Sequence, residues 1–295
     1  MGTLTTSLSQ DGSIRIIFSQ STSIVTEAQR IHRLSKTATA ALGRALTATS
    51  IMASTLKNVT DSLTLQIKGD GPLGTILCVG EADGCVRGYV ARPETELPLN
   101  AKGKFDVGGA VGAGQLYVIK DMGLNKPYVG VSNLISGEIA EDIAEYYAVS
   151  EQIPTVCALG VRVAETGECI GAGGFLLQLM PFADKGLIPK IEENISSLES
   201  ISLMIAKGES VESILKKIYK DIAFDILDSC EAKYRCNCSK DKYAAALITL
   251  GEKELREMTE DNEPIEARCN FCDTKYIFST EEMKELLEYA VRKNE

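Results

Sequence analysis

The sequence is poor in the residue that most often serves as a catalytic base, since it contains one histidine, and it has no tryptophan. A nucleophile–histidine triad would have to use His32, and a metal site with two histidine ligands is excluded. His32 lies in a helical run between Arg30 and Arg33, and the sequence indicates no serine or cysteine partner for it. We interpret it as a surface or packing residue, and we expect no catalytic residues and no enzymatic activity.

Long hydrophobic runs are also missing. No apolar stretch approaches the roughly 18 residues that a membrane-spanning helix needs. The first residues carry no positive charge before Arg15 and no apolar segment, so we expect no secretory signal. The sequence therefore predicts a protein of the reducing cytoplasm with no membrane partner.

Basic residues are outnumbered by acidic residues. Lysine and arginine total 31 against 41 acidic residues, a net charge of −10. An acidic chain repels phosphate backbones, which disfavours nucleic acid as a partner. Residues 69–74 satisfy the G-x-G-x-x-G pattern, but a strand-like segment follows where a dinucleotide site needs a helix. Residues 108–114 lack the lysine of a phosphate loop. We therefore expect no nucleotide and no organic cofactor.

Cysteine, in contrast, is abundant. The nine cysteines are Cys78, Cys85, Cys157, Cys169, Cys230, Cys236, Cys238, Cys269 and Cys272. In a reducing compartment they are thiols or metal ligands rather than structural disulfides. The first four lie in or beside predicted strands, so we interpret them as packing residues. Cys230 lies nearer the last four; we interpret it as a further packing residue, and the alternatives are a competing ligand or a thiol that is oxidised.

The last four cysteines form two close pairs. Cys236-Asn237-Cys238 is separated by thirty residues from Cys269-Asn270-Phe271-Cys272. Four converging thiolates suit tetrahedral zinc, with Zn–S distances of about 2.3 Å. The segment contains no histidine, so tetrahedral coordination there would be completed by the four cysteine sulfurs. The alternative is four unrelated buried cysteines, and two close pairs in one short segment argue against it.

Residues 1–179 have the pattern of an α+β domain. The strand-like segments are residues 13–18, 63–67, 74–79, 85–91, 115–121, 156–163 and 175–179. A helix rich in small residues is expected from Glu27 to Leu56, and Ser136 is expected to cap a second. We expect the glycine-rich stretches 108–114 and 171–174 to cross flexibly between strands. This pattern predicts a mixed, largely antiparallel sheet with helices on one face.

Two further parts follow in the sequence. Residues 180–229 carry apolar side chains at helical spacing, punctuated by proline and glycine, and predict a helical connector whose stripes lie on the first domain, the last domain or a partner. Residues 230–295 predict a small zinc-binding domain with helices at 240–250 and 281–291. A hairpin over residues 265–278 would carry Cys269 and Cys272 in its turn. Ser279 and Glu282 have capping-box spacing.

A domain of about sixty-five residues has a marginal core. Zinc binding to such a peptide is worth ~10–16 kcal/mol, as much as the ~5–15 kcal/mol stability of a whole domain. Removal of zinc should therefore unfold residues 230–295. Because zinc holds its ligands as thiolates, a strong oxidant can convert them to disulfides and eject the ion.

Several motifs, taken in order with the cysteine pairs, closely resemble the bacterial heat-shock protein 33 family. They are residues 37–44, residues 69–74, Val86-Arg87-Gly88-Tyr89-Val90, residues 147–155, which include Ser150-Glu151-Gln152-Ile153-Pro154-Thr155, and Gly174-Phe175-Leu176-Leu177-Gln178-Leu179-Met180-Pro181. The resemblance covers essentially the whole chain, and nothing departs from the family at the four cysteine positions.

This resemblance implies an ATP-independent holdase chaperone. In the reduced form Cys236, Cys238, Cys269 and Cys272 would bind one Zn²⁺ per chain, and the protein would be inactive. Oxidative stress would form disulfides 236–238 and 269–272, release zinc, unfold the last domain and loosen the connector. The protein would then form a homodimer, and apolar surface of its first domain would bind unfolded or misfolding client proteins.

Two other functions stay open at the level of sequence. A zinc-ribbon protein bound to nucleic acid or the ribosome is disfavoured by the charges of residues 230–295, which are 11 basic against 15 acidic. A thiol oxidoreductase using Cys269 and Cys272 would place its pair at the start of a helix rather than in a hairpin. Retention on heparin would favour the first, and catalytic reduction of insulin disulfides the second.

Overall fold

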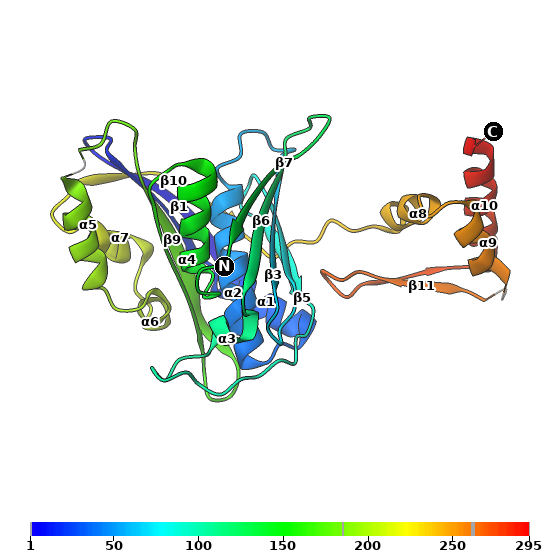
Figure 1. The fold of residues 1–295 in the computed structure, drawn as a ribbon, viewed down its shortest axis with the longest axis horizontal. Coiled ribbons are helices and arrows are strands. Elements are labelled where there is room, and N and C mark those ends of the chain that lie inside the picture. Colours follow the sequence, from blue (N-terminus) through cyan, green and yellow to red (C-terminus); the bar gives the residue numbers. More distant parts are fainter. Residues whose placement is uncertain (1, 185, 261–262, 295) are drawn as a thin grey trace. The chain divides into compact units, whose positions relative to one another are not determined.

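The computed structural model describes residues 2–184, 186–260 and 263–294. Its contacts divide the chain into two units, residues 1–235 and residues 236–295. Figure 1 shows the elements of each unit. Within the described residues no helix combines the length and the apolar composition that crossing a membrane requires.

The first unit contains two five-stranded antiparallel sheets. The first sheet has the order β10 (Phe224–Ala232), β1 (Gly2–Ser9), β2 (Ile14–Gln20), β9 (Cys169–Leu179) and β8 (Thr155–Val163). The second has the order β5 (Val86–Val90), β4 (Ile76–Glu81), β3 (Ser62–Gly69), β6 (Gly114–Asp121) and β7 (Tyr128–Asn133). The α+β class with largely antiparallel sheets is thereby confirmed. The sequence did not indicate β1, β7 and β10.

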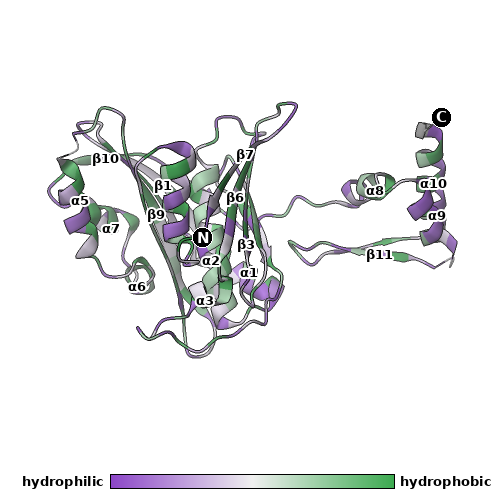
Figure 2. Ribbon diagram, viewed as in Figure 1, coloured by the Kyte–Doolittle hydropathy of each residue, from purple (hydrophilic) through white to green (hydrophobic). Residues whose placement is uncertain are grey.

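The expected helix from Glu27 to Leu56 is in fact two helices, α1 (Thr22–His32) and α2 (Lys36–Ala53). Arg33 ends α1 in the left-handed conformation, with a φ of 51°, and the Ser35 side chain accepts a hydrogen bond from the Ala38 N–H to cap α2. The α2 helix lies between the two sheets and is buried on nearly every side (Figure 1). Its small residues allow this close approach, and Figure 2 colours it mostly white and green.

The second expected helix is present, but Ser136 does not cap it. The helix α4 (Ala140–Tyr146) continues into a π-helical turn, η1 (Tyr147–Glu151). The Asp142 carboxylate accepts hydrogen bonds from the N–H groups of residues 135, 136, 137 and 139, and so closes the helix start. The predictions for the two glycine-rich stretches, residues 108–114 and 171–174, were also wrong. Residues 107–111 form the short helix α3 (Val107–Val111), and residues 171–174 lie inside β9.

The apolar stripes of residues 180–229 lie on the first sheet. The helices α5 (Leu187–Ser196), α6 (Ile201–Ala206) and α7 (Val211–Tyr219), called here the connector helices, cover its outer face (Figure 1). Their buried residues, among them Met204 and Ile218, pack in one cluster with side chains of β2 and β9. The Tyr219 hydroxyl donates to the Ile14 carbonyl at 3.4 Å. The chain then forms β10, which pairs with β1 along its length, so residues 224–229 are strand rather than helix.

The second unit has a small core. It contains α8 (Lys240–Ile248), α9 (Glu252–Glu260), the hairpin of β11 (Ile265–Arg268) and β12 (Lys275–Phe278), and α10 (Thr280–Asn294). The hairpin and the two expected helices are confirmed, whereas α9 was not expected. The Ser279 hydroxyl and the Glu282 carboxylate bond each other's backbone N–H groups, as the capping box predicts. The fully buried apolar side chains described in this unit's core cluster are Leu255, Phe278, Met283 and Ala290.

Candidate metal centre

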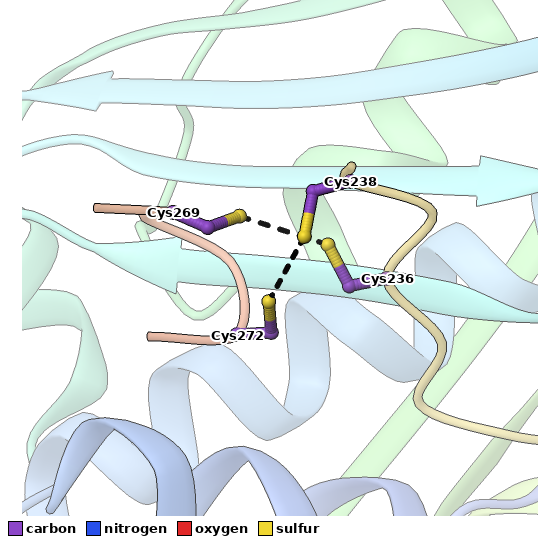
Figure 3. A group of neighbouring side chains, drawn as sticks. All are labelled: Cys236, Cys238, Cys269 and Cys272. Carbon is purple, nitrogen blue, oxygen red and sulfur yellow. Dashed lines mark hydrogen bonds between the residues drawn. The ribbon is translucent and has the colours of Figure 1, made fainter. Parts of the chain in front are cut away.

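Four sulfur atoms converge in the second unit. The Sγ atoms of Cys236, Cys238, Cys269 and Cys272 all lie within 4.8 Å of one another, and the side chains point toward a common centre (Figure 3). The Cys236 and Cys269 sulfurs are 3.7 Å apart, and those of Cys238 and Cys272 are 3.3 Å apart. A tetrahedron with Zn–S distances of about 2.3 Å has sulfurs about 3.8 Å apart, whereas a disulfide brings them to about 2.05 Å. The sulfurs are therefore spaced for a metal ion and not for disulfides.

The β11–β12 hairpin positions the second cysteine pair. The Cys269 N–H donates to the Thr274 carbonyl, and the Asp273 N–H donates to the Cys269 carbonyl, both at 2.9 Å. Asp273 has a φ of 63° and forms an ion pair with Arg268 across the turn. This tight turn directs the sulfurs of Cys269 and Cys272 to the same side.

The start of α8 positions the first pair. Cys238 precedes Ser239, whose side chain accepts a hydrogen bond from the Lys242 N–H and caps the helix. The Lys242 Nζ also donates to the Asn237 carbonyl at 2.7 Å. The segment with Cys236 and Cys238 is thus held against the first turn of α8.

Hydroxyl groups surround the sulfurs. The Tyr276 hydroxyl donates to the Cys238 Sγ at 3.1 Å, and the Thr274 hydroxyl lies 3.2 Å from the Cys272 Sγ. The Tyr243 hydroxyl donates to the carbonyl of Arg268, the residue before Cys269, at 3.3 Å and helps to lower the pKa of Cys269. Outer hydrogen bonds of this kind orient metal ligands and tune their basicity. The sequence analysis missed these three residues, although two of them follow Cys272 within four positions.

The thiols differ in acidity. Burial would raise the pKa of Cys269, but the N–H groups of Phe271 and Cys272 and the Tyr243 hydroxyl stabilise its thiolate and lower its pKa to about 7. Burial raises the pKa of Cys236 and of Cys238 instead. Because a metal binds thiolates, an ion entering this site displaces protons from these two sulfurs. The donor set is soft and tetrahedral, and it is compatible with zinc.

The other candidate residues belong to the first unit and are not members of this cluster. Burial raises the pKa of the Cys78 and Cys157 thiols strongly and that of Cys169 to about 11, which makes these thiols poor nucleophiles. Cys230 is exposed on β10. His32 places its Nε2 atom 3.1 Å from the Tyr234 hydroxyl, in agreement with a packing role.

Comparisons with known proteins agree on one family. Residues 2–279 match the family model described as Hsp33 protein. The chain is 48% identical to the 33 kDa chaperonin of Acetivibrio thermocellus over 94% of both chains. It is 46% identical to the 33 kDa chaperonin of Clostridioides difficile over 95% of this chain and 96% of that one. The crystal structure of the 33 kDa chaperonin (heat shock protein 33 homolog) from Thermotoga maritima aligns with a TM-score of 0.90 at 39% identity, covering 98% of this chain and 99% of that one.

Proposed function

The chain belongs to the Hsp33 family, and from that membership we propose that it is a redox-regulated, ATP-independent holdase chaperone of the cytoplasm. The convergence of four sulfur atoms in the second unit is the observation that carries this proposal. In the reduced protein Cys236, Cys238, Cys269 and Cys272 hold one zinc ion. The chaperonin names of the relatives support a role in binding proteins rather than in catalysis.

Zinc keeps the second unit folded in the reduced state. The small core of this unit supplies little hydrophobic stabilisation. Zinc bound by four thiolates contributes ~10–16 kcal/mol, which exceeds what such a core provides. The second unit is therefore folded with the metal and unfolded without it.

Oxidation removes the ligands. Two thiolates lose two electrons to one peroxide molecule, which takes up two protons and leaves as two water molecules, while one S–S bond forms. Two such steps consume all four thiolates, and the sulfurs no longer bind zinc. We propose the pairs 236–238 and 269–272, which the family resemblance implies. Peptide mapping of the oxidised protein distinguishes them from the cross pairs 236–269 and 238–272.

The client surface is the outer face of the first sheet. The connector helices bury Ile14, Ile16 and Phe18 of β2 and Phe175 and Leu177 of β9 in the reduced protein. When the second unit unfolds, these helices loosen and expose a continuous apolar face. Such a face binds unfolded clients and pairs two chains in the active dimer. Residues 1–179 then form the binding and dimerisation domain, 180–229 the connector and 230–295 the redox switch.

The experiment follows zinc release and client protection together. The reduced protein is treated with peroxide at raised temperature, zinc is recorded with a chromogenic chelator, and light scattering reports the aggregation of a thermally unfolding client without ATP. We expect the zinc-loaded protein to give the client no protection from aggregation, and we expect protection to increase as zinc is released. Equal protection by the zinc-loaded and the oxidised protein would overturn the proposal.

A further inference from the structure

The first unit contains a cavity between α2, the edge strand β8, the loop of residues 99–105 and the start of α6. Its volume is about 350 Å³, which is within the range of small-molecule sites. It contains none of the four clustered cysteines, so it is independent of the proposed redox switch.

Cationic side chains line this cavity. Arg44 comes from α2, Lys104 from the loop and Arg162 from β8. None of the lining residues in the described part of the chain is acidic. Among these three cations, Arg44 forms an ion pair with Glu138 in the described residues, whereas Lys104 and Arg162 form none, so the lining keeps a positive charge that attracts anions.

Arg44 has one side of its guanidinium available. Its Nη1 atom donates to the carbonyl of Glu138 at 3.1 Å and also to the Glu138 carboxylate. Within the described residues its Nη2 atom has no hydrogen-bond partner and is not among the buried unpaired atoms. That atom is therefore not fully buried, and Arg44 is one of the residues that line the cavity. The pair with Glu138 fixes the plane of the guanidinium.

Lys104 and Arg162 supply uncompensated charge. Neither side chain makes an ion pair or hydrogen bond with any residue that the structure describes, and both residues are exposed. A turn fixes the backbone of Lys104, because the Asn100 N–H donates to its carbonyl at 2.7 Å. The nearest acidic group along the loop, Asp106, accepts a hydrogen bond from the Gly109 N–H to cap α3 and does not line the cavity. Set against the Glu138 carboxylate that pairs with Arg44, the three lining cations leave an excess charge of about two, which matches a phosphate monoester at neutral pH.

The remaining lining is largely apolar. Side chains of Leu99, Phe105, Leu159, Val161 and Val163 contribute to it, and Ser200 and Ser202 add hydroxyl groups at one edge. An apolar wall beside a cationic rim suits an anion that carries a hydrocarbon portion. We propose that this cavity binds a small phosphate monoester, with its phosphate on Arg44, Lys104 and Arg162 and its apolar portion against Phe105 and Val161.

Calorimetric titration of the reduced, zinc-loaded full chain with n-hexyl phosphate tests this proposal. We expect saturable binding of one molecule per chain, weakened by rising salt. Inorganic phosphate should bind more weakly because it lacks the apolar portion, and n-hexanol should give no saturable binding because it lacks the charge. The double variant Lys104→Gln/Arg162→Gln should weaken hexyl phosphate binding at least tenfold, which corresponds to about 1.4 kcal/mol.

Lys102→Gln is the matched control, since Lys102 is exposed on the same loop but does not line the cavity. It should leave the affinity unchanged. The absence of saturable binding at millimolar hexyl phosphate would overturn the proposal. So would equal affinities of the double variant and the Lys102→Gln control, or equal binding of hexanol and hexyl phosphate.

Discussion

At the scale of single residues, the surroundings of each sulfur separate the cysteines into two kinds. Cys78 and Cys157 sit in apolar surroundings that raise the pKa of their thiols and suppress their reactivity. The four sulfurs of the second unit instead lie within 4.8 Å of one another, and neighbouring N–H and hydroxyl groups lower the pKa of one of them, Cys269, to about 7. Metal binding and oxidation are therefore expected at the second group and not at the first.

Replacing Cys269 by serine should abolish tight zinc binding, because three sulfurs leave one coordination position open. We expect less than one zinc per chain after dialysis against a weak chelator, and faster proteolysis within residues 236–295. The control is Cys230→Ser, at an exposed cysteine outside the cluster, which should keep one zinc per chain. A full zinc content in Cys269→Ser would contradict the ligand assignment.

Replacing Tyr276 by phenylalanine removes the hydroxyl that donates to the Cys238 sulfur. Loss of such an outer hydrogen bond costs about 10–100-fold in metal affinity. Competition with a chromogenic chelator measures the change. Tyr289→Phe, on the exposed side of α10, is the matched control and should leave the affinity unchanged. Identical affinities of both variants would show that the Tyr276 hydroxyl does not support the site.

Zinc affinity should fall as the pH falls from about 8 to about 6, because protons compete for the thiolates. The folded arrangement lowers the pKa of Cys269 to about 7, below that of a free thiol. The stabilisation from this thiolate is present above the pKa of the unfolded chain and is lost as the pH falls through about 7. The raised pKa values of Cys236 and Cys238 add to the proton competition. An affinity that does not change over this range would contradict this account.

At the scale of elements, the sequence pattern predicted those elements that are held together by interactions between residues close in the sequence. The hairpin around Cys269 and the capping box at Ser279 were predicted because their residues are neighbours in sequence. The strand β10 was not predicted, since its residues are mostly exposed and it is a strand because it pairs with β1, more than two hundred positions away. The break at Arg33 was missed for a similar reason, because helical periodicity continues across it.

In the candidate metal centre, too, the sequence pattern predicted some contacts and not others. The cysteine spacing predicted the four converging sulfurs, because two close pairs in one short segment already bring ligands together. The hydroxyl donors were not predictable in this way. Tyr276 reaches the Cys238 sulfur only because of the hairpin register, and Tyr243 of α8 reaches the backbone beside Cys269 only because the helix packs near the hairpin.

Weakening the packing of a connector helix should activate the reduced protein. Ile218 of α7 is 1% exposed and packs in the cluster with β2 and β9, so Ile218→Ala should cost about 2–5 kcal/mol. We expect increased binding of a hydrophobic dye and partial client protection with zinc still bound. Glu212→Ala, at an exposed position of the same helix, should change neither. An Ile218→Ala variant that is destabilised but neither binds more dye nor protects the client would contradict the placement of the client surface.

At the scale of the whole molecule, the two units differ in what stabilises them. The first unit buries α2 between two sheets and closes the outer face of one sheet with the connector helices. Its stability comes from hydrophobic burial and does not require a metal. The second unit has a small core, and its four sulfurs link the start of α8 to the β11–β12 hairpin. Loss of the metal should therefore unfold the second unit and leave the sheets of the first intact.

Hydrogen–deuterium exchange of the reduced protein before and after zinc chelation tests this claim most directly. We predict that amides of β11, β12 and α10 are protected with zinc and lose protection once the metal is chelated, while the amides of β3 and β6 stay protected. Protection of residues 236–294 that persists unchanged in the fully reduced, zinc-free protein would contradict the account.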